Sequence, residues 1–440
     1  MQKISAALSL SLATFASGFL LAACETPSTP PNGTANNGAT STPAAQTTTS
    51  SGSGLKIGSL LPTTGDLASI GQQMAAAVPL VVETVNACGG VNGQPVSLVA
   101  VDDQTDPRAG AAGMTKLATI DKVAGVVGSF ASSVSTAAVS IAAQNKVMLV
   151  SPGSTSPVFT EKAQKGDFQG FWARTVPPDS YQGPALAELA QKKGFKRVST
   201  IVINNDYGVG FEKAFVQAFE KLGGTVVNKN NPVRYDPKAT TFETEAASAF
   251  AGKPDAVLGV FYVETGSLLL KSAYQQGVAQ GVQVMLTDGM KSDEFPVQVG
   301  KTGDGKFIAS GIIGTVPGSD GKGLEALNKL WQSKKGSAPG EFAPQAWDAT
   351  ALLVLAAQAA KENTGVGIAG KIREVSSAPG VEVTDVCEGL KLIKEGKDIN
   401  YQGASGNVDI DANGDVIGVY DVWAVGDDGK IKTVDKVTPK

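Results

Sequence analysis

The chain has 440 residues and a formal net charge of −4, and it contains no histidine. Its length exceeds one ordinary domain, so two domains are expected. An acidic balance argues against a nucleic-acid partner, which would require a basic face. The lack of histidine removes the Ser-His-Asp and Cys-His arrangements and most catalytic zinc sites. We therefore expect a protein that is not an enzyme.

The first 23 residues have the features of an export signal. Lys3 supplies a positive charge, residues 4–21 are apolar or small, and Leu-Ala-Ala stands directly before Cys24. This arrangement resembles the lipobox of bacterial lipoproteins and predicts a signal peptide followed by a lipid on Cys24. An ordinary signal peptide with an incidental cysteine is the alternative. Residues 24–54 are rich in Thr, Ser, Pro, Gly and Asn, which predicts a flexible tether.

From Leu55 onward, strand-like and helix-like patterns alternate, which favours an α/β fold with parallel strands. Pro79 falls inside the first helical pattern, where it could bend the helix. In this first series the predicted strands are Lys56–Pro62, Val96–Val101, Val123–Val127 and Val147–Val150, and the predicted helices are Gly71–Ala87, 107–119 and Val134–Gln144.

Two loops of this series, Gly128–Ser133 and Ser151–Pro157, follow neighbouring strands. Ligands of open parallel sheets bind at the carboxyl ends of the strands. The loops offer hydroxyls, glycine and backbone amides but no lysine or arginine, which favours a small carboxylate over a polyphosphate. The alternative is that Ser132 and Ser133 only cap the following helix.

Residues 171–178 contain two prolines and predict an extended crossover into a second α/β series. Its predicted strands are Val198–Ile203, Thr225–Val227, Ala256–Phe261 and Val282–Leu286. Its predicted helices are Tyr181–Lys193, one opened by Asn204–Gly208, Thr241–Ala251 and Gly266–Gln276.

Lys306–Pro317 predicts a second, strand-like crossover that returns to the first lobe. Helices are then expected near Gly323–Lys334, Pro344–Lys361 and Val383–Lys394. A third crossover at 401–406 would lead into a hairpin over 407–425, which alternates apolar and polar residues around Asn413-Gly414.

Two further features bear on covalent and metal chemistry. With Cys24 lipidated, Cys88 and Cys387 form an even pair in an exported protein, so a disulfide is possible; two separate buried thiols are the alternative. The acidic run Asp409–Asp415 echoes the start of an EF-hand loop, but Tyr420 stands where the bidentate glutamate is needed. No metal site and no cofactor are expected.

Several short motifs, taken together and in their order along the chain, carry a resemblance to a known family. They are KIGSLLPTTGDLASIG, NACGGVNGQPV, DDQTDP, VGSFASSVSTAA, VSPGSTSPVFT, NNDYGVGF and GASGNVDIDANGDV. On these motifs the chain, from about Leu55 to Asp428, resembles the periplasmic branched-chain-amino-acid-binding proteins. These are type I solute-binding proteins of ABC transporters, the Leu/Ile/Val-binding group, here in lipoprotein form.

The resemblance implies two Rossmann-like α/β lobes joined by three crossovers, with the ligand in the interlobe cleft. Together with the element pattern, it places residues 55–176 and 312–402 in lobe one and residues 177–311 and 403–430 in lobe two.

The resemblance also implies a set of ligand-binding residues. Ser132 matches the serine that holds the ligand carboxylate, the Gly153 carbonyl would receive the ammonium, and Thr155 would contact both groups. Tyr207 matches the first aromatic residue of lobe two. The second aromatic falls at Phe261 or Tyr262, and the acid that pairs with the ammonium falls at Asp288, where the family typically has Glu. Ile70 stands near the position of an aromatic that often caps the ligand's side chain.

The function implied is an extracytoplasmic lipoprotein that captures a neutral, aliphatic L-amino acid and delivers it to the permease of an ABC importer. Its location would be the periplasm or the outer face of the cytoplasmic membrane, with the anchor at Cys24. A binding protein or sensor for urea, a short amide or an aromatic acid is the second hypothesis. A hydrolase on the same sheet edge is disfavoured, because no Ser stands within G-x-S-x-G and nothing activates a nucleophile.

Overall fold

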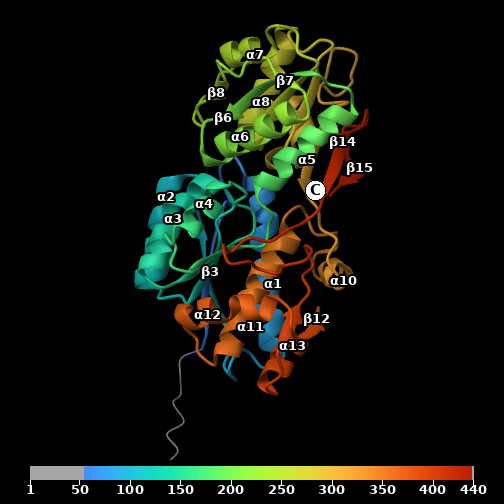
Figure 1. Cartoon of the computed structure of the whole chain (residues 1–440). Helices are drawn as coiled ribbons and strands as arrows, with labels where there is room; N and C mark the ends of the chain where they lie inside the picture. The colour runs from blue at the N-terminus through green and yellow to red at the C-terminus, as the bar shows by residue number, and fades with distance from the viewer. Residues whose placement is uncertain (1–53, 439–440) are drawn as a thin grey trace, which may run out of the picture. The chain divides into compact units, whose positions relative to one another are not determined.

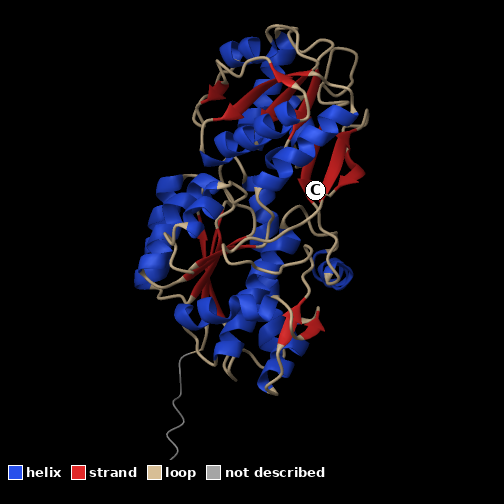
Figure 2. Ribbon diagram, in the orientation of Figure 1, coloured by secondary structure: helices blue, strands red, loops and turns tan. Residues whose placement is uncertain are grey.

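The computed structural model describes residues 54–438, so the predicted signal peptide, Cys24 and nearly all of the predicted tether lie outside the described residues. Two sheets carry the fold, each packed against helices (Figure 1; Figure 2). Within residues 54–438, no helix combines the length and the apolar character needed to cross a bilayer.

The first sheet has five parallel strands in the order β2-β1-β3-β4-β5. Every residue of β3 and β4 is buried, as expected for apolar strands covered on both faces. The strands are β1 Lys56–Leu61, β2 Ser97–Asp102, β3 Gly125–Gly128, β4 Met148–Ser151 and β5 Trp172–Arg174. The accompanying helices are α1 Ala68–Ala87, α2 Pro107–Thr115, α3 Ser132–Gln144, α4 Val158–Gln164, α11 Ala343–Ala360, α12 Gly365–Ser376 and α13 Val386–Lys394.

The second sheet follows the order β15-β14-β11-β10-β9-β6-β7, and β8 also pairs with β6. Its strands are β6 Arg197–Ile203, β7 Thr225–Val226, β8 Val233–Tyr235, β9 Ala256–Val260, β10 Gln283–Leu286, β11 Ile313–Pro317, β14 Tyr420–Val425 and β15 Ile431–Val437. Its helices are α5 Asp179–Lys192, α6 Asp206–Lys221, α7 Glu243–Phe250, α8 Val263–Gln275 and α9 Phe295–Val299. The remaining elements are α10 Leu324–Lys335, the small pair β12 Val381–Val383 and β13 Ile399–Tyr401, the π-helical turn η1 Lys116–Ile120 and the 3₁₀ turn η2 Asp288–Met290.

The strand pairings change two predicted boundaries. The end of lobe two moves beyond residue 430, because β15, Ile431–Val437, pairs with β14 in the second sheet. The other change concerns β11. The sequence pattern assigns residues 312–317 to a crossover that belongs to lobe one. In the structure, β11 pairs in parallel with β10 and antiparallel with β14, so it is a strand of the second sheet. A short apolar run followed by proline does not reveal which sheet the strand enters, because that depends on its neighbours. We propose the predicted lobe division with residues 313–317 moved to lobe two and lobe two extended to Val437.

The predicted hairpin around Asn413-Gly414 is wrong. Residues 402–419 form no strand, and the antiparallel pair at the end of the chain is β14 with β15, joined through Gly426–Lys430. The Asp411 side chain instead accepts from the backbone amides of Asn413 and Asp415, and the Gly414 carbonyl accepts from the Arg174 amide. These bonds satisfy the polar groups that a hairpin would have used.

The third crossover is fixed to lobe one by a buried acid. Asp348 in α11 accepts hydrogen bonds from the backbone amides of Ala404 and Ser405 at 2.9 and 2.7 Å, and from the Tyr401 hydroxyl at 3.0 Å. Burial raises the pKa of Asp348 from its ordinary value of 3.8 to about 6. Asp348 therefore anchors the segment that leaves β13 for the second sheet.

A disulfide joins Cys88, directly after α1, to Cys387 in α13, with 5.9 Å between their Cα atoms. The possible disulfide of the sequence analysis is thus present in the structure, and the two separate thiols are not. Because the two cysteines lie 299 residues apart in sequence, the bond closes a very long loop and ties the beginning of the folded chain to its last helix.

Candidate functional site

The two hydroxyl-rich loops meet at the start of α3. Ala131 occupies the N-cap position, and Ser132 is the first residue of the helix, so Ser132 is not the cap. Its hydroxyl accepts instead from the Ser156 amide, at 3.2 Å, across to the loop that follows β4. Ser151 and Ser154 both donate to the Ser129 carbonyl, at 2.6 and 3.1 Å. The loops are thereby held in one fixed arrangement before any ligand arrives.

A buried acid supports these loops from beneath. Asp103 follows β2, accepts a hydrogen bond from the Ser129 hydroxyl and is fully buried. Burial raises the pKa of Asp103 from 3.8 to about 6, while the Ser129 and Thr105 donors oppose that rise. Asp103 acts through Ser129, so it is a positioning residue of the loop.

Tyr207 and Tyr262 form the lobe-two wall. Asn205 caps α6 by accepting from the Gly208 amide at 3.0 Å, which places Tyr207 in the first turn. The Tyr207 ring stacks on Tyr262, with the centroids 5.8 Å apart and the planes 9° apart. Its hydroxyl lies 2.7 Å from the Thr287 hydroxyl and 3.0 Å from Asp288 Oδ1, and it can donate to either of them.

A small cavity of about 10 Å³, room for about one water molecule, lies between these walls. We call it the clamp cavity. Five of the predicted residues line it, namely Ser132, Gly153, Tyr207, Tyr262 and Asp288, together with Leu67, Phe130, Ala131 and Gly289. The structure thus brings together residues that are 156 positions apart in the sequence.

Three other predicted residues lie elsewhere. Phe261 packs in the core of lobe two, with its ring centroid 5.9 Å from that of Tyr235, so Tyr262 supplies the second aromatic wall. Thr155 is fully buried, and in the described part of the chain its hydroxyl has no hydrogen-bond partner. Ile70 lines a neighbouring, larger pocket.

Gly153 is required by close packing against Phe130. A Cβ atom at this position would stand 1.8 Å from the Phe130 ring, far inside van der Waals contact. Any other residue would push Phe130 out of the clamp cavity wall, so the loop can approach a ligand here only with its backbone.

Asp179 is the residue that the sequence analysis missed. It is the first residue of α5, it is fully buried, and among residues 54–438 neither of its carboxyl oxygens has a hydrogen-bond partner. Burial, and then the nearby charge of Asp288, raise the pKa of Asp179 well above its ordinary value of 3.8, while the neighbouring Thr155 hydroxyl and the positive charge of Arg174 oppose the rise. Burial likewise raises the pKa of Asp288, to about 6.

Arg174, the nearby cation, already forms an ion pair with another acid. Its buried guanidinium pairs with Asp415 at 2.7 Å and donates to the carbonyls of Ser154 and Ser156 at 2.9 and 3.1 Å. These bonds fix the backbone on either side of Thr155. In the described part of the chain, Asp179 and Asp288 form no ion pair, so the two acids share a buried region that lacks a direct counter-cation.

The acids of the EF-hand-like segment Asp409–Asp415 form other contacts. Asp411 caps the local backbone turn, and Asp415 pairs with Arg174. No group of three or more metal-binding side chains is found within residues 54–438.

The sequence pattern described as the receptor family ligand binding region matches residues 73–428. The chain belongs to this family. Among relatives, the chemotactic signal transduction system substrate-binding protein BasB of Halobacterium salinarum is 28% identical over 368 residues, covering 82% of this chain and 84% of BasB. Leu/Ile/Val-binding protein homolog 2 of Brucella abortus is 28% identical over 323 residues, covering 73% of this chain and 82% of that protein.

Solved structures share this fold. The leucine-binding protein LivK of Thermotoga maritima gives a TM-score of 0.73 at 25% identity, covering 88% of this chain and 99% of LivK. The substrate-binding protein LivJ of Streptococcus pneumoniae, solved with isoleucine, gives 0.71 at 23%, covering 88% and 100%. A solute-binding protein of R. palustris, solved with benzoate, gives 0.70 at 19%, covering 88% and 97%.

These likenesses confirm the predicted family and fold. The protein is a type I periplasmic solute-binding protein of the branched-chain amino-acid ABC transport type, built from two α/β lobes. Family and fold are those of solute-binding proteins rather than of enzymes.

Proposed function

We propose that this protein captures a neutral L-amino acid between its two lobes and delivers it to the permease of an ABC importer. One observation carries the proposal. Two buried carboxyls, Asp179 and Asp288, lie close enough for the charge of one to act on the other, and the nearby cation Arg174 is already paired with Asp415. A buried charge without a partner is strongly disfavoured, and an ammonium group supplies the missing cation.

The two ends of the amino acid would be held by different groups. The carboxylate would face Ser132 and the amides at the start of α3, where the helix dipole favours an anion. The ammonium would face Asp288 and Asp179, with the Gly153 carbonyl and Thr155 hydroxyl as further acceptors. The clamp cavity holds only about 10 Å³, so the lobes must part to admit a ligand and close again around it.

The second hypothesis, an aromatic acid, a short amide or urea, receives less support. An aromatic acid carries no cation, and its carboxylate would add a further negative charge near two buried acids. Urea and short amides are neutral and leave both acids uncompensated. The likeness to the benzoate-bound protein, at 19% identity, concerns the fold.

Calorimetric titration of the full chain with neutral amino acids, benzoate and urea tests the proposal. Amino acids should bind and benzoate should not. Asp288→Asn and Asp179→Asn should each weaken amino-acid binding by about 100-fold or more, because a buried ammonium then loses a partner. Asp348→Asn, at an equally buried acid that anchors the third crossover, is the matched control. Binding of urea or benzoate that survives Asp288→Asn, with no amino acid bound, would establish the second hypothesis.

The aliphatic side chain, the lipid anchor and the extracytoplasmic site remain proposals of the same kind. The names of the Leu/Ile/Val-binding relatives support an aliphatic ligand. The Leu-Ala-Ala-Cys24 motif supports an anchor that holds the protein near its permease, in the periplasm or on the outer face of the membrane. Metabolic labelling with a fatty acid should mark the protein and should fail with Cys24→Ser.

A further inference from the structure

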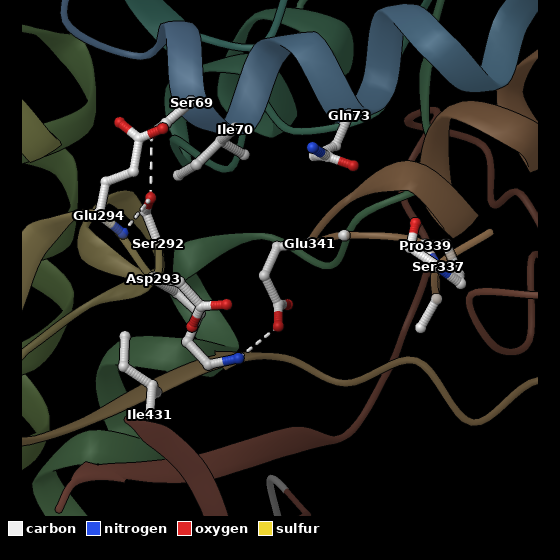
Figure 3. A pocket seen from close by; sticks show the side chains of 13 residues that line it. Ser69, Ile70, Gln73, Ser292, Asp293, Glu294, Ser337, Pro339, Glu341 and Ile431 are labelled. Carbon is white, nitrogen blue, oxygen red and sulfur yellow. Dashed lines mark hydrogen bonds and ion pairs between the residues drawn. The ribbon is translucent and has the colours of Figure 1, made fainter. Parts of the chain in front are cut away.

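A larger pocket of about 420 Å³ lies next to the clamp cavity, and we call it the side chamber. One side comes from α1 and the loop before α11, and the other from the segment after Asp288 (Figure 3). Figure 3 shows Ser69, Ile70 and Gln73 on α1 facing Ser292 and Glu341. The chamber therefore has walls from both lobes, like the clamp cavity.

The walls of the two cavities are continuous along the chain. Leu67 lines the clamp cavity, and Ser69 and Ile70 line the side chamber. Gly289 lines the clamp cavity, and Lys291, two residues later, lines the side chamber. Residues that are close in sequence therefore border both cavities, on α1 and on the segment after Asp288.

Polar groups dominate the interior of the side chamber. Lys291 forms an ion pair with Glu341 across the lobes, and their side chains are only 13% and 35% exposed. The Ser292 hydroxyl donates to that of Ser69 at 3.0 Å, and Gln73 faces the same space. Asp293 and Glu294 also border the chamber but are exposed to solvent.

These groups discriminate between kinds of side chain. An aliphatic side chain would displace water from the Lys291–Glu341 pair and the hydroxyls. It could not form the hydrogen bonds that the water had formed with them. A charged side chain would find no unpaired opposite charge, because Lys291 and Glu341 already neutralise each other. A carboxamide has two donors and an acceptor, and it can replace the displaced water.

We propose that the side chamber receives the side chain of the bound amino acid and selects a polar, uncharged one of the carboxamide type, with Lys291 and Glu341 as the residues that determine specificity. This inference rests on the proposed function, and it replaces the aliphatic side chain expected from the family resemblance with a polar one.

Titration of the full chain with glutamine, leucine and alanine tests it. Glutamine should bind at least about 10-fold more tightly than leucine, since a site built for hydrogen bonds penalises a ligand that lacks them. The double variant Lys291→Met/Glu341→Leu should reduce that ratio about 10-fold or more. Alanine, whose methyl group does not extend into the chamber, reports on the clamp cavity alone and should bind the variant as before.

Lys238→Met is the matched control, because it removes a different interlobe ion pair, Lys238 with Asp106 at 3.5 Å, and leaves the side chamber unchanged. Leucine that binds as tightly as glutamine, or a ratio unchanged in the double variant, would overturn the inference while leaving the proposed function intact. If the double variant no longer binds alanine, the single variant Glu341→Gln is tested in its place. The ratio of glutamine to leucine affinity is then measured in the same way. Failure of all three amino acids to bind the unaltered chain would refute the proposed function itself.

Discussion

Capture of an amino acid should release protons, because Asp179 and Asp288 must ionise before they can pair with an ammonium. Burial raises the pKa of Asp288 from 3.8 to about 6, and it raises that of Asp179 well above its ordinary value. A bound ammonium favours the charged form of both acids, so their pKa values fall in the complex. The ligand therefore binds the deprotonated protein, and its affinity should increase with pH.

The magnitude follows from the Asp288 value. With a pKa of about 6 in the free protein, its ionised fraction is about nine-tenths at about pH 7 and about one-tenth at about pH 5. Kd should therefore rise about 10-fold over that decrease in pH. Titration of Asp179 adds a further loss of affinity wherever the pH is below its own raised pKa. The amino group of the ligand, with a pKa of about 8 or higher, stays protonated through this range.

Calorimetry in phosphate and in imidazole measures the effect, because both buffers accept protons in this pH range and do so with different heats. The difference between the apparent enthalpies should correspond to about half a proton per ligand from Asp288 at about pH 6, and any proton that Asp179 releases adds to it. Asp103→Asn is a control, since Asp103 also has a raised pKa but lies beneath the loop, where it accepts from Ser129. Its removal should leave the proton count unchanged. Equal heats in both buffers, together with a Kd that does not vary between about pH 5 and pH 7, would refute the reasoning.

Three further outcomes are expected. Ser132→Ala should weaken amino-acid binding about 10-fold or more, as it removes a carboxylate donor and leaves the Ser156 amide unpaired, whereas Ser133→Ala should have little effect on the measured Kd. Asp415→Ala should lower the free energy of unfolding by about 3–5 kcal/mol in urea titrations, because Arg174 is then a buried, unpaired cation. Replacing both disulfide cysteines by alanine should cost about 5 kcal/mol in the same assay, given the length of the closed loop; an unchanged midpoint would contradict the chain-entropy account.

The site was predictable where a motif fixes both a residue and its position on a sheet edge. Ser132, Gly153, Tyr207 and Asp288 each stand near the end of a strand, so parallel topology places the first two at one edge of the first sheet and the last two at one edge of the second. Asp179 escaped prediction because an acid at the first position of a helix is common for reasons of the helix dipole alone. Its distinguishing property is complete burial without a partner, which depends on residues from distant parts of the chain.

The hairpin around Asn413-Gly414 failed for a similar reason. Residues 411–415 do form a turn, in which the Asp411 amide donates to the Asp415 carbonyl. No strands pair on either side of this turn, and the Asp415 side chain pairs with Arg174 on β5 instead. The choice between Phe261 and Tyr262 also required the structure. Neighbouring residues at the end of a strand point in opposite directions, and only the packing of Phe261 against Tyr235 shows which of them faces the core.

The sequence by itself determined the alternation of strands and helices, the family, and the hydroxyl-rich loops after β3 and β4. These follow from periodicity and from motifs that are local in the chain. Only the tertiary structure decided that β11 joins the second sheet, that Cys88 meets Cys387, and that Asp179 and Asp288 share one buried space. Each of these depends on contacts between distant segments, and sequence periodicity carries no information about which distant segments meet.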